Sequence, residues 1–328
     1  MRPIVQAGEL RGVCLSNSIR LLLKRDYLQR LIYVFTVLKH DLSSSHTTFE
    51  HKLKYVIRNC FENSTNAMSK TAALEFIKHF YALQISVQSS YYLRLQNVLD
   101  SENIRRVQSS LNSDVDSSRL KFASMLYCSG HHQAAVRVLE DVERRYHSNV
   151  MAVCWFREYQ RDRDLKVFAD MLSGNKEEGI SQLPFELCVS FLRQESYCTP
   201  FILLFEMNRN ITEEEVTQGT YAEKLWMDSA EVDARPFLYY LQYLKYGGLG
   251  ERDNQLHALG VFKSYMLDKR NMINMYHVDT SLSLLGHCYE MEGNVNAGLH
   301  YYQQSLLQGG TNNAANWHVR RVLSLLSD

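Results

Sequence analysis

The stretch Asp279–Asn312, DTSLSLLGHCYEMEGNVNAGLHYYQQSLLQGGTN, determines how the rest of the chain is interpreted. Apolar and small residues recur every three or four positions on both sides of Gly293, as in two amphipathic helices joined by a tight turn. Glycine tolerates the left-handed backbone that ends many helices, so Gly293 marks the turn. Gly286 and Gly298 lie on opposite sides of it, where a missing Cβ lets two helices approach closely. The stretch therefore predicts a helical hairpin.

The spacing of these residues matches the tetratricopeptide pattern of about 34 residues. A weaker copy covers residues 116–149, with Gly130 at the turn. A divergent copy covers about 235–268, with a longer turn at Gly247–Gly250. Residues 314–326 predict a terminal capping helix. We therefore expect an all-α, tetratricopeptide-like helical-repeat solenoid, because each such hairpin buries its apolar face only against its neighbours.

Two regions are expected along the chain. Residues 1–110 form an N-terminal helical region that fits no repeat, and residues 111–328 form the repeat region. The boundary follows from residues 101–115, which are rich in Ser, Asn and Asp. The apolar residues of 18–40 keep a helical period, and only four prolines occur in the whole chain.

The charge of the chain is balanced overall but uneven. Residues 1–100 hold 13 Lys and Arg against 7 Asp and Glu, and the remaining residues carry the opposite excess. Such an asymmetry could steer an anionic partner toward the N-terminal region. Ordinary solvated helix faces are the alternative, because no basic block lies beside an aromatic platform.

The cysteines and the hydropathy indicate a cytoplasmic protein. Seven cysteines are scattered singly without a Cys-x-x-Cys motif, as in proteins whose thiols stay reduced. The first residues contain no secretory signal, and the longest strongly apolar run, Leu31–Leu38, falls far below the roughly 20 residues that span a bilayer. We expect no membrane association.

Motifs of enzyme chemistry are missing from the sequence. Gly247-Gly-Leu-Gly250 follows a predicted helix and lacks the Gly-Lys-Ser/Thr ending of a phosphate-binding loop. The pairs His131-His132 and His287-Cys288 have no partners at the spacing of metal ligands. No Gly-x-Ser-x-Gly motif occurs. The sequence therefore predicts no enzyme, no catalytic or metal-ligating residues and no cofactor.

Several longer blocks resemble the C-terminal repeat regions of invertebrate proteins that carry a male-abnormal-type (Mab-21-like), cyclic GMP–AMP synthase-like nucleotidyltransferase domain. The resemblance covers about residues 120–326. The blocks that carry it are Cys154–Arg157 with Asp164–Asp170, Phe201–Glu215, Val232–Phe237, Tyr243–Asn254 and Leu285–Gly293. It implies a helical-repeat tail that, in longer relatives, is attached to a nucleotidyltransferase module used in innate immunity.

This chain departs from that layout. It contains no Gly-Ser followed by a strand with spaced acidic residues, which such enzymes need to hold metal and nucleotide. We therefore expect no nucleotidyl transfer. Either the chain is a repeat-only relative, or an upstream portion precedes it in the natural product.

The expected function is that of a protein-binding scaffold or adaptor whose concave groove holds a peptide or helix of another protein. By resemblance to known repeats, the groove positions of the last repeat are Thr280, Ser283, His287, Glu290 and Met291. Those of the first repeat are Ser117, Leu120, Ser124, Tyr127 and Cys128. The alternative is that these residues only contact neighbouring helices.

A second function stays open at this point. The repeats would be the regulatory region of an innate-immune, nucleotidyltransferase-type nucleic-acid sensor, and the basic N-terminal region would help it approach RNA or DNA. A nucleic-acid partner enters only in this alternative. The oligomeric state and the identity of the partner do not follow from the sequence.

Overall fold

The computed structural model describes residues 84–96, 104–105, 117–146, 151–154, 185–209, 229–309 and 312–327. All of them belong to one compact unit, Glu75–Trp155 with Glu178–Asp328. The other unit, Met1–Leu74 with Phe156–Glu177, lies outside the described residues, and so do most of the helices expected in the N-terminal region. The helix over residues 84–96 is described. Its Ile85 and Leu93 share a core with Phe122 of the first repeat.

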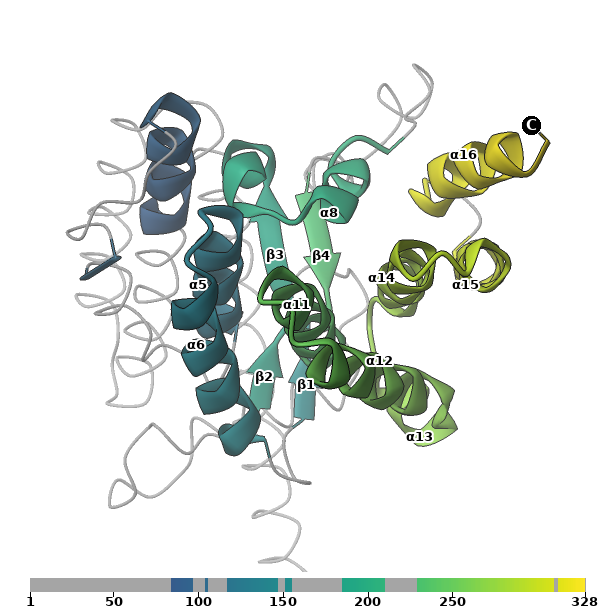
Figure 1. The fold of residues 1–328 in the computed structure, drawn as a ribbon, viewed down its shortest axis with the longest axis horizontal. Coiled ribbons are helices and arrows are strands. Elements are labelled where there is room, and N and C mark those ends of the chain that lie inside the picture. Colours follow the sequence, from purple (N-terminus) through teal and green to yellow (C-terminus); the bar gives the residue numbers. More distant parts are fainter. Residues whose placement is uncertain are drawn as a thin grey trace, which may run out of the picture. The chain divides into compact units, whose positions relative to one another are not determined.

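The described part of the chain is mostly helical (Figure 1). None of its helices is both long and apolar enough to cross a membrane. In chain order the elements are α5 (Ser117–Cys128), α6 (His132–Arg145), β1 (Met151–Val153), β2 (Phe185–Leu187), β3 (Val189–Leu192), the 3-10 helix η2 (Arg193–Cys198), α8 (Phe201–Glu206), β4 (Ser229–Val232), α11 (Ala234–Gly248), α12 (Arg252–Leu267), α13 (Lys269–Asn274), α14 (Val278–Met291), α15 (Val295–Gln308) and α16 (Ala315–Ser327).

Four short strands depart from the all-α expectation. β1 pairs with β2 in parallel, and β3 pairs with β4 in an antiparallel arrangement. Each strand is only three or four residues long. β4 is buried throughout and β3 nearly so. Because both faces of β3 and β4 are largely buried, the alternation of apolar and polar residues that predicts a strand is missing there.

Three pairs of consecutive helices form hairpins that close with the same turn. The pairs are α5–α6, α11–α12 and α14–α15, and in each a three-residue connection contains a left-handed glycine: Gly130 (φ 77°), Gly250 (φ 73°) or Gly293 (φ 73°). The next residue's amide donates back to a carbonyl of the first helix, as Asn294 N does to Tyr289 O at 2.9 Å. This is the Schellman arrangement.

The prediction of a longer turn at Gly247–Gly250 is wrong. α11 continues through Gly248, and Glu251 N donates to Tyr246 O at 2.9 Å, as the corresponding residues do in the other two hairpins. The last carbonyls of α11 accept hydrogen bonds from the amides that follow Gly248, and the helix ends there. The length of the turn therefore depends on Gly250, which has the positive φ, and not on Gly247 or Gly248.

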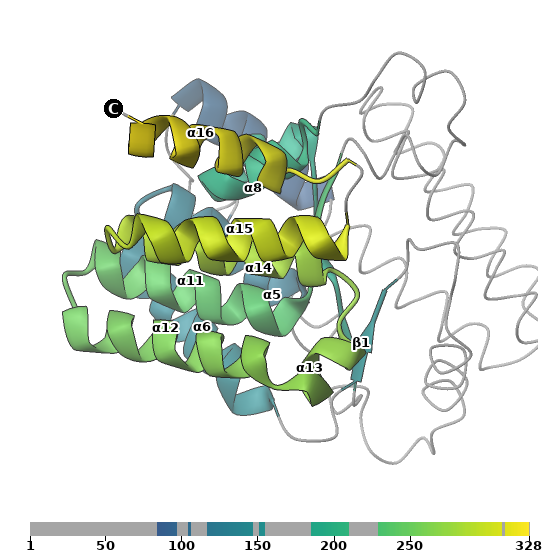
Figure 2. The ribbon, with the colours of Figure 1, turned by 90° about the vertical axis from the view of Figure 1, so that its right-hand side faces the viewer.

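The hairpins pack against one another in chain order. α11 contacts both α5 and α6, α14 contacts α11 and α12, and α16 packs on α15. Figure 2 shows the helices of the last two pairs running along a common direction. Leu120, Phe237 and Leu285, one from each hairpin, are fully buried in one continuous core.

The helices of the last hairpin approach each other at their two glycines, as the sequence predicts. A Cβ placed on Gly286 would lie 2.9 Å from Tyr302 Cε1 and 3.1 Å from the Gly298 carbonyl oxygen. A Cβ on Gly298 would lie 3.1 Å from the Gly286 oxygen. Real Cβ contacts are rarely this short, so a Cβ at either position would force the neighbouring helix or the Tyr302 ring to shift.

A buried ion pair joins the first hairpin to the segment with strands. Lys121 Nζ lies 2.6 Å from Glu195 Oε1, and the Glu195 side chain is fully buried. The same carboxylate accepts hydrogen bonds from Leu192 N (2.8 Å) and from Ser86 Oγ. Burial of a carboxylate without partners would lower the free energy of unfolding, and these donors offset that loss.

We predict that Gly286→Ala destabilises the protein by about 1–3 kcal/mol, because the new methyl group pushes α15 and the Tyr302 ring away from α14. Urea unfolding followed by circular dichroism measures this change. Gly260→Ala on α12 is the matched control, because nothing lies within 4 Å of its added Cβ. It should be neutral or stabilise by up to about 1 kcal/mol. Equal effects at both positions would contradict the close approach of α14 and α15.

Candidate functional site

The structure places most of the predicted groove residues inside the fold. Thr280, Ser283, Ser117, Leu120 and Ser124 are buried. His287, Glu290, Tyr127 and Cys128 are half-buried. Met291, with 51% of its surface exposed, is the one largely exposed side chain among the ten.

Contacts with neighbouring helices and loops explain this burial. Ser283 Oγ donates to Ser305 Oγ at 3.2 Å, and Ser124 Oγ donates to the Cys198 carbonyl at 2.6 Å. Glu290 accepts a hydrogen bond from Tyr302 Oη at 2.8 Å and forms an ion pair with Arg321. These are the helix–helix contacts that the sequence left open as the alternative to a groove.

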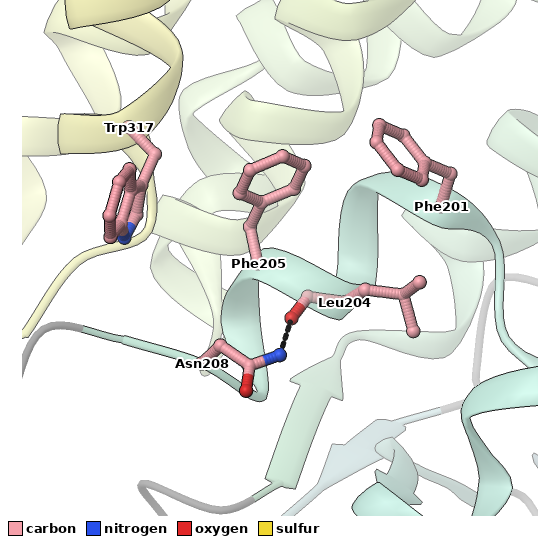
Figure 3. Close-up of a pocket in the computed structure, with 5 residues that line it drawn as sticks. All are labelled: Phe201, Leu204, Phe205, Asn208 and Trp317. Carbon is pink, nitrogen blue, oxygen red and sulfur yellow. Dashed lines mark hydrogen bonds between the residues drawn. The ribbon is translucent and has the colours of Figure 1, made fainter.

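A shallow apolar notch of about 280 Å³ lies instead between α8 and α16 (Figure 3). Figure 3 shows the Phe205 ring between those of Phe201 and Trp317. Phe201 is 67% exposed and Trp317 40% exposed, which is unusual for such large apolar side chains. Leu204 and Asn208 complete the lining, and Asn208 Nδ2 donates to the Leu204 carbonyl at 2.8 Å.

A buried histidine packs against Phe205 on the interior side of the notch. The His318 ring lies 4.6 Å from the Phe205 ring and stacks 4.8 Å from that of Tyr302. Neither ring nitrogen has a hydrogen-bond partner among the residues that the structure describes. Burial, and then the charges of Arg321 and His287, lower the pKa of His318 to about 3. The imidazole is therefore neutral and packs as an aromatic ring.

A second candidate site is a buried cluster of Cys154, Cys188 and His277. Their sulfur and nitrogen atoms all lie within 4.8 Å of one another. Cys154 Sγ is 3.4 Å from His277 Nε2. Two carboxylates adjoin the cluster: Glu231 Oε2 lies 3.7 Å from His277 Nε2, and Asp233 Oδ1 accepts from Cys188 Sγ at 3.7 Å.

The charges in this cluster depend on one another. The hydrogen bond from Cys188, and then the charge of His277, lower the pKa of the Cys154 thiol against the effect of burial. Burial by itself would lower the pKa of His277, but Cys154 and the two carboxylates raise it. Burial raises the pKa of Cys188. The cluster therefore favours a Cys154 thiolate beside a charged His277.

Neither the notch nor the cysteine–histidine cluster is predicted by the sequence. Cys154, Cys188 and His277 are far apart in the chain and follow no spacing of known metal or catalytic motifs, so only the fold brings them together. Phe201 and Trp317 lie on predicted helices, where apolar residues normally indicate the buried face. Phe201 and Phe205, one turn apart on a short predicted helix, were the one local signal for the notch.

We predict that acid destabilises the fold through His318. Its pKa in the folded state lies below the ordinary value of 6.5, so the unfolded chain binds more protons between these two values. The free energy of unfolding should therefore fall by up to about 1.4 kcal/mol per pH unit from this group as the pH drops below 6.5. Urea unfolding at pH 7, 6 and 5 measures the slope.

His318→Phe should reduce that slope and raise the stability at pH 7 by about 1 kcal/mol, because it removes two buried nitrogens without partners. His287, whose pKa burial lowers to about 4, leaves a residual slope of the same sign. His257→Phe, at an exposed position on α12, is the control for the loss of one histidine. Identical pH curves for wild type and His318→Phe would show that His318 is not a buried neutral group.

Comparison with known proteins gives no relative: no protein-family model, no curated protein and no solved structure matches the chain significantly. The resemblance to repeat regions of nucleotidyltransferase-type proteins therefore stays a prediction.

Proposed function

We propose that the chain is a non-enzymatic scaffold of the tetratricopeptide-like solenoid class that binds a peptide or an amphipathic helix of another protein. Three hairpins with the same three-residue turn support the repeat class. Their packing in chain order supports a solenoid, because each unit contacts mainly its neighbours. The free thiols at all five described cysteines agree with a reducing compartment such as the cytoplasm.

The exposed notch between α8 and α16 is the observation that carries this proposal. Exposed aromatic side chains beside a depression are typical anchors of protein interfaces, where Trp in particular contributes a large share of the binding energy. Its volume of about 280 Å³ is below the range of most cofactor and small-molecule pockets. It suits one large apolar side chain of a partner.

The two helices that border the notch define the form of the ligand. Amphipathic helices commonly bind in an apolar depression between two helices, and residues one turn apart then act as anchors. We infer that the partner offers such a helix or peptide to Phe201, Phe205 and Trp317. Met291 of the predicted groove is the other exposed apolar residue to be tested.

Selection from a displayed library of amphipathic helical peptides, with the full chain as bait, tests the proposal. Peptides enriched by the wild type should lose at least tenfold in affinity for the double variant Phe201→Ser/Trp317→Ser, which corresponds to about 1.4 kcal/mol. Both residues are exposed, so the variant should keep the circular dichroism and unfolding midpoint of the wild type.

Leu307→Ser is the matched control, because Leu307 is 76% exposed on α15 and does not line the notch. It should bind the selected peptides like the wild type. Loss of binding in Met291→Glu, but not in the notch variant, would move the site to the predicted groove. Binding of RNA that weakens with salt, without any peptide enrichment, would favour the nucleic-acid sensor instead.

A further inference from the structure

The two cysteines of the buried cluster are brought together by the register of a strand pair. β1 and β2 run in parallel with Val153 opposite Leu187. Cys154 and Cys188 are the next residues on each strand, so they leave the sheet side by side. Neighbouring strands lie about 4.8 Å apart, close enough for cysteine side chains on adjacent strands to reach one ion.

His277 and Glu231 reach the cysteines from other elements. His277 is the residue before α14, and Glu231 lies in β4 opposite Ser190 of β3. Ser190 Oγ donates to Glu231 Oε1 at 3.3 Å, which directs the second oxygen, Oε2, toward His277 Nε2. Cys154, Cys188 and His277 therefore converge on one point inside the fold, and the Glu231 carboxylate adjoins this point on the side of His277.

Asp233 holds this arrangement in place. Its carboxylate accepts hydrogen bonds from the backbone amides of Tyr276 (3.0 Å) and His277 (2.8 Å) and from the Cys188 thiol. It thereby fixes the backbone at His277, and in the metal-free protein it also orients the Cys188 thiol. Carboxylates that orient metal ligands from outside the coordination sphere are common in zinc proteins.

We propose that Cys154, Cys188 and His277 bind one structural Zn²⁺ ion and that the adjoining Glu231 carboxylate turns toward the ion as its fourth ligand. Zinc accepts thiolate, imidazole and carboxylate ligands in a tetrahedral arrangement. Bond lengths of about 2.3 Å to sulfur and 2.0 Å to nitrogen place these two atoms about 3.5 Å apart. The separation of 3.4 Å between Cys154 Sγ and His277 Nε2 agrees with this geometry.

The ion binds four groups that the protein supplies, so no open position is left for a substrate. On binding, Cys188 and the charged His277 each release a proton to solvent, so that Cys154 and Cys188 bind as thiolates and His277 binds through Nε2 as a neutral imidazole. A nucleophilic cysteine would need access from solvent, and only 2% of the surface of Cys154 is exposed. The ion instead ties both small sheets to the start of α14.

Metal titration of the full chain tests this site. The metal-free wild type should bind one Zn²⁺ per chain, measured by native mass spectrometry, and its unfolding midpoint should rise by on the order of 5–10 °C. Co²⁺ as a probe should give the near-ultraviolet charge-transfer band of a thiolate complex. A wild type that gives no such band, or whose Cys154 and Cys188 form a disulfide without reductant, would overturn the proposal.

Single variants locate the ion. Cys188→Ser and His277→Gln should lose zinc binding and the zinc-dependent rise of the midpoint. Cys198→Ser is the matched control, because Cys198 is fully buried outside the cluster, and it should bind zinc like the wild type. Should a cluster variant fail to fold, Co²⁺ bound to the wild type still reports the number of sulfur ligands. Zinc retained by both folded cluster variants would refute the assignment.

Discussion

Each hairpin of this fold reverses the chain within three residues, and a left-handed glycine makes the reversal. Gly130, Gly250 and Gly293 adopt a backbone that a Cβ would strain, and the amides that follow them close the preceding helix. Because all three connections have the same length, the second helix of each pair starts from the same position. α11 packs against both α5 and α14, so the first helices of consecutive hairpins lie side by side.

The interior combines this helical packing with buried polar contacts that join distant segments. Lys121 and Glu195 link the first hairpin to η2, and Asp233 links the end of β4 to the start of α14. In both places, donors or an opposite charge offset the desolvation of the buried carboxylate. Such contacts specify one arrangement of the segments, which apolar packing alone would leave less defined.

The two candidate sites follow from different physical causes. The notch exists because α8 is short and leaves Phe201 and Phe205 beside Trp317 of the last helix. The cysteine–histidine cluster exists because a strand register places two cysteines side by side where two carboxylates and a histidine also meet. The notch is suited to a partner from outside, whereas the cluster is suited to an ion held within the fold.

The sequence by itself determined the hairpins, because helix period, turn glycines and small residues at close contacts are local features. The tertiary structure alone decided the strands, the burial of Thr280, Ser283 and Ser124, and both sites. β3 and β4 are four residues long and buried on both faces almost throughout, so they have no alternating pattern. Which face of a helix stays exposed depends on the elements that pack against it. Cys154, Cys188 and His277 come together through the strand register, which no local spacing in the sequence encodes.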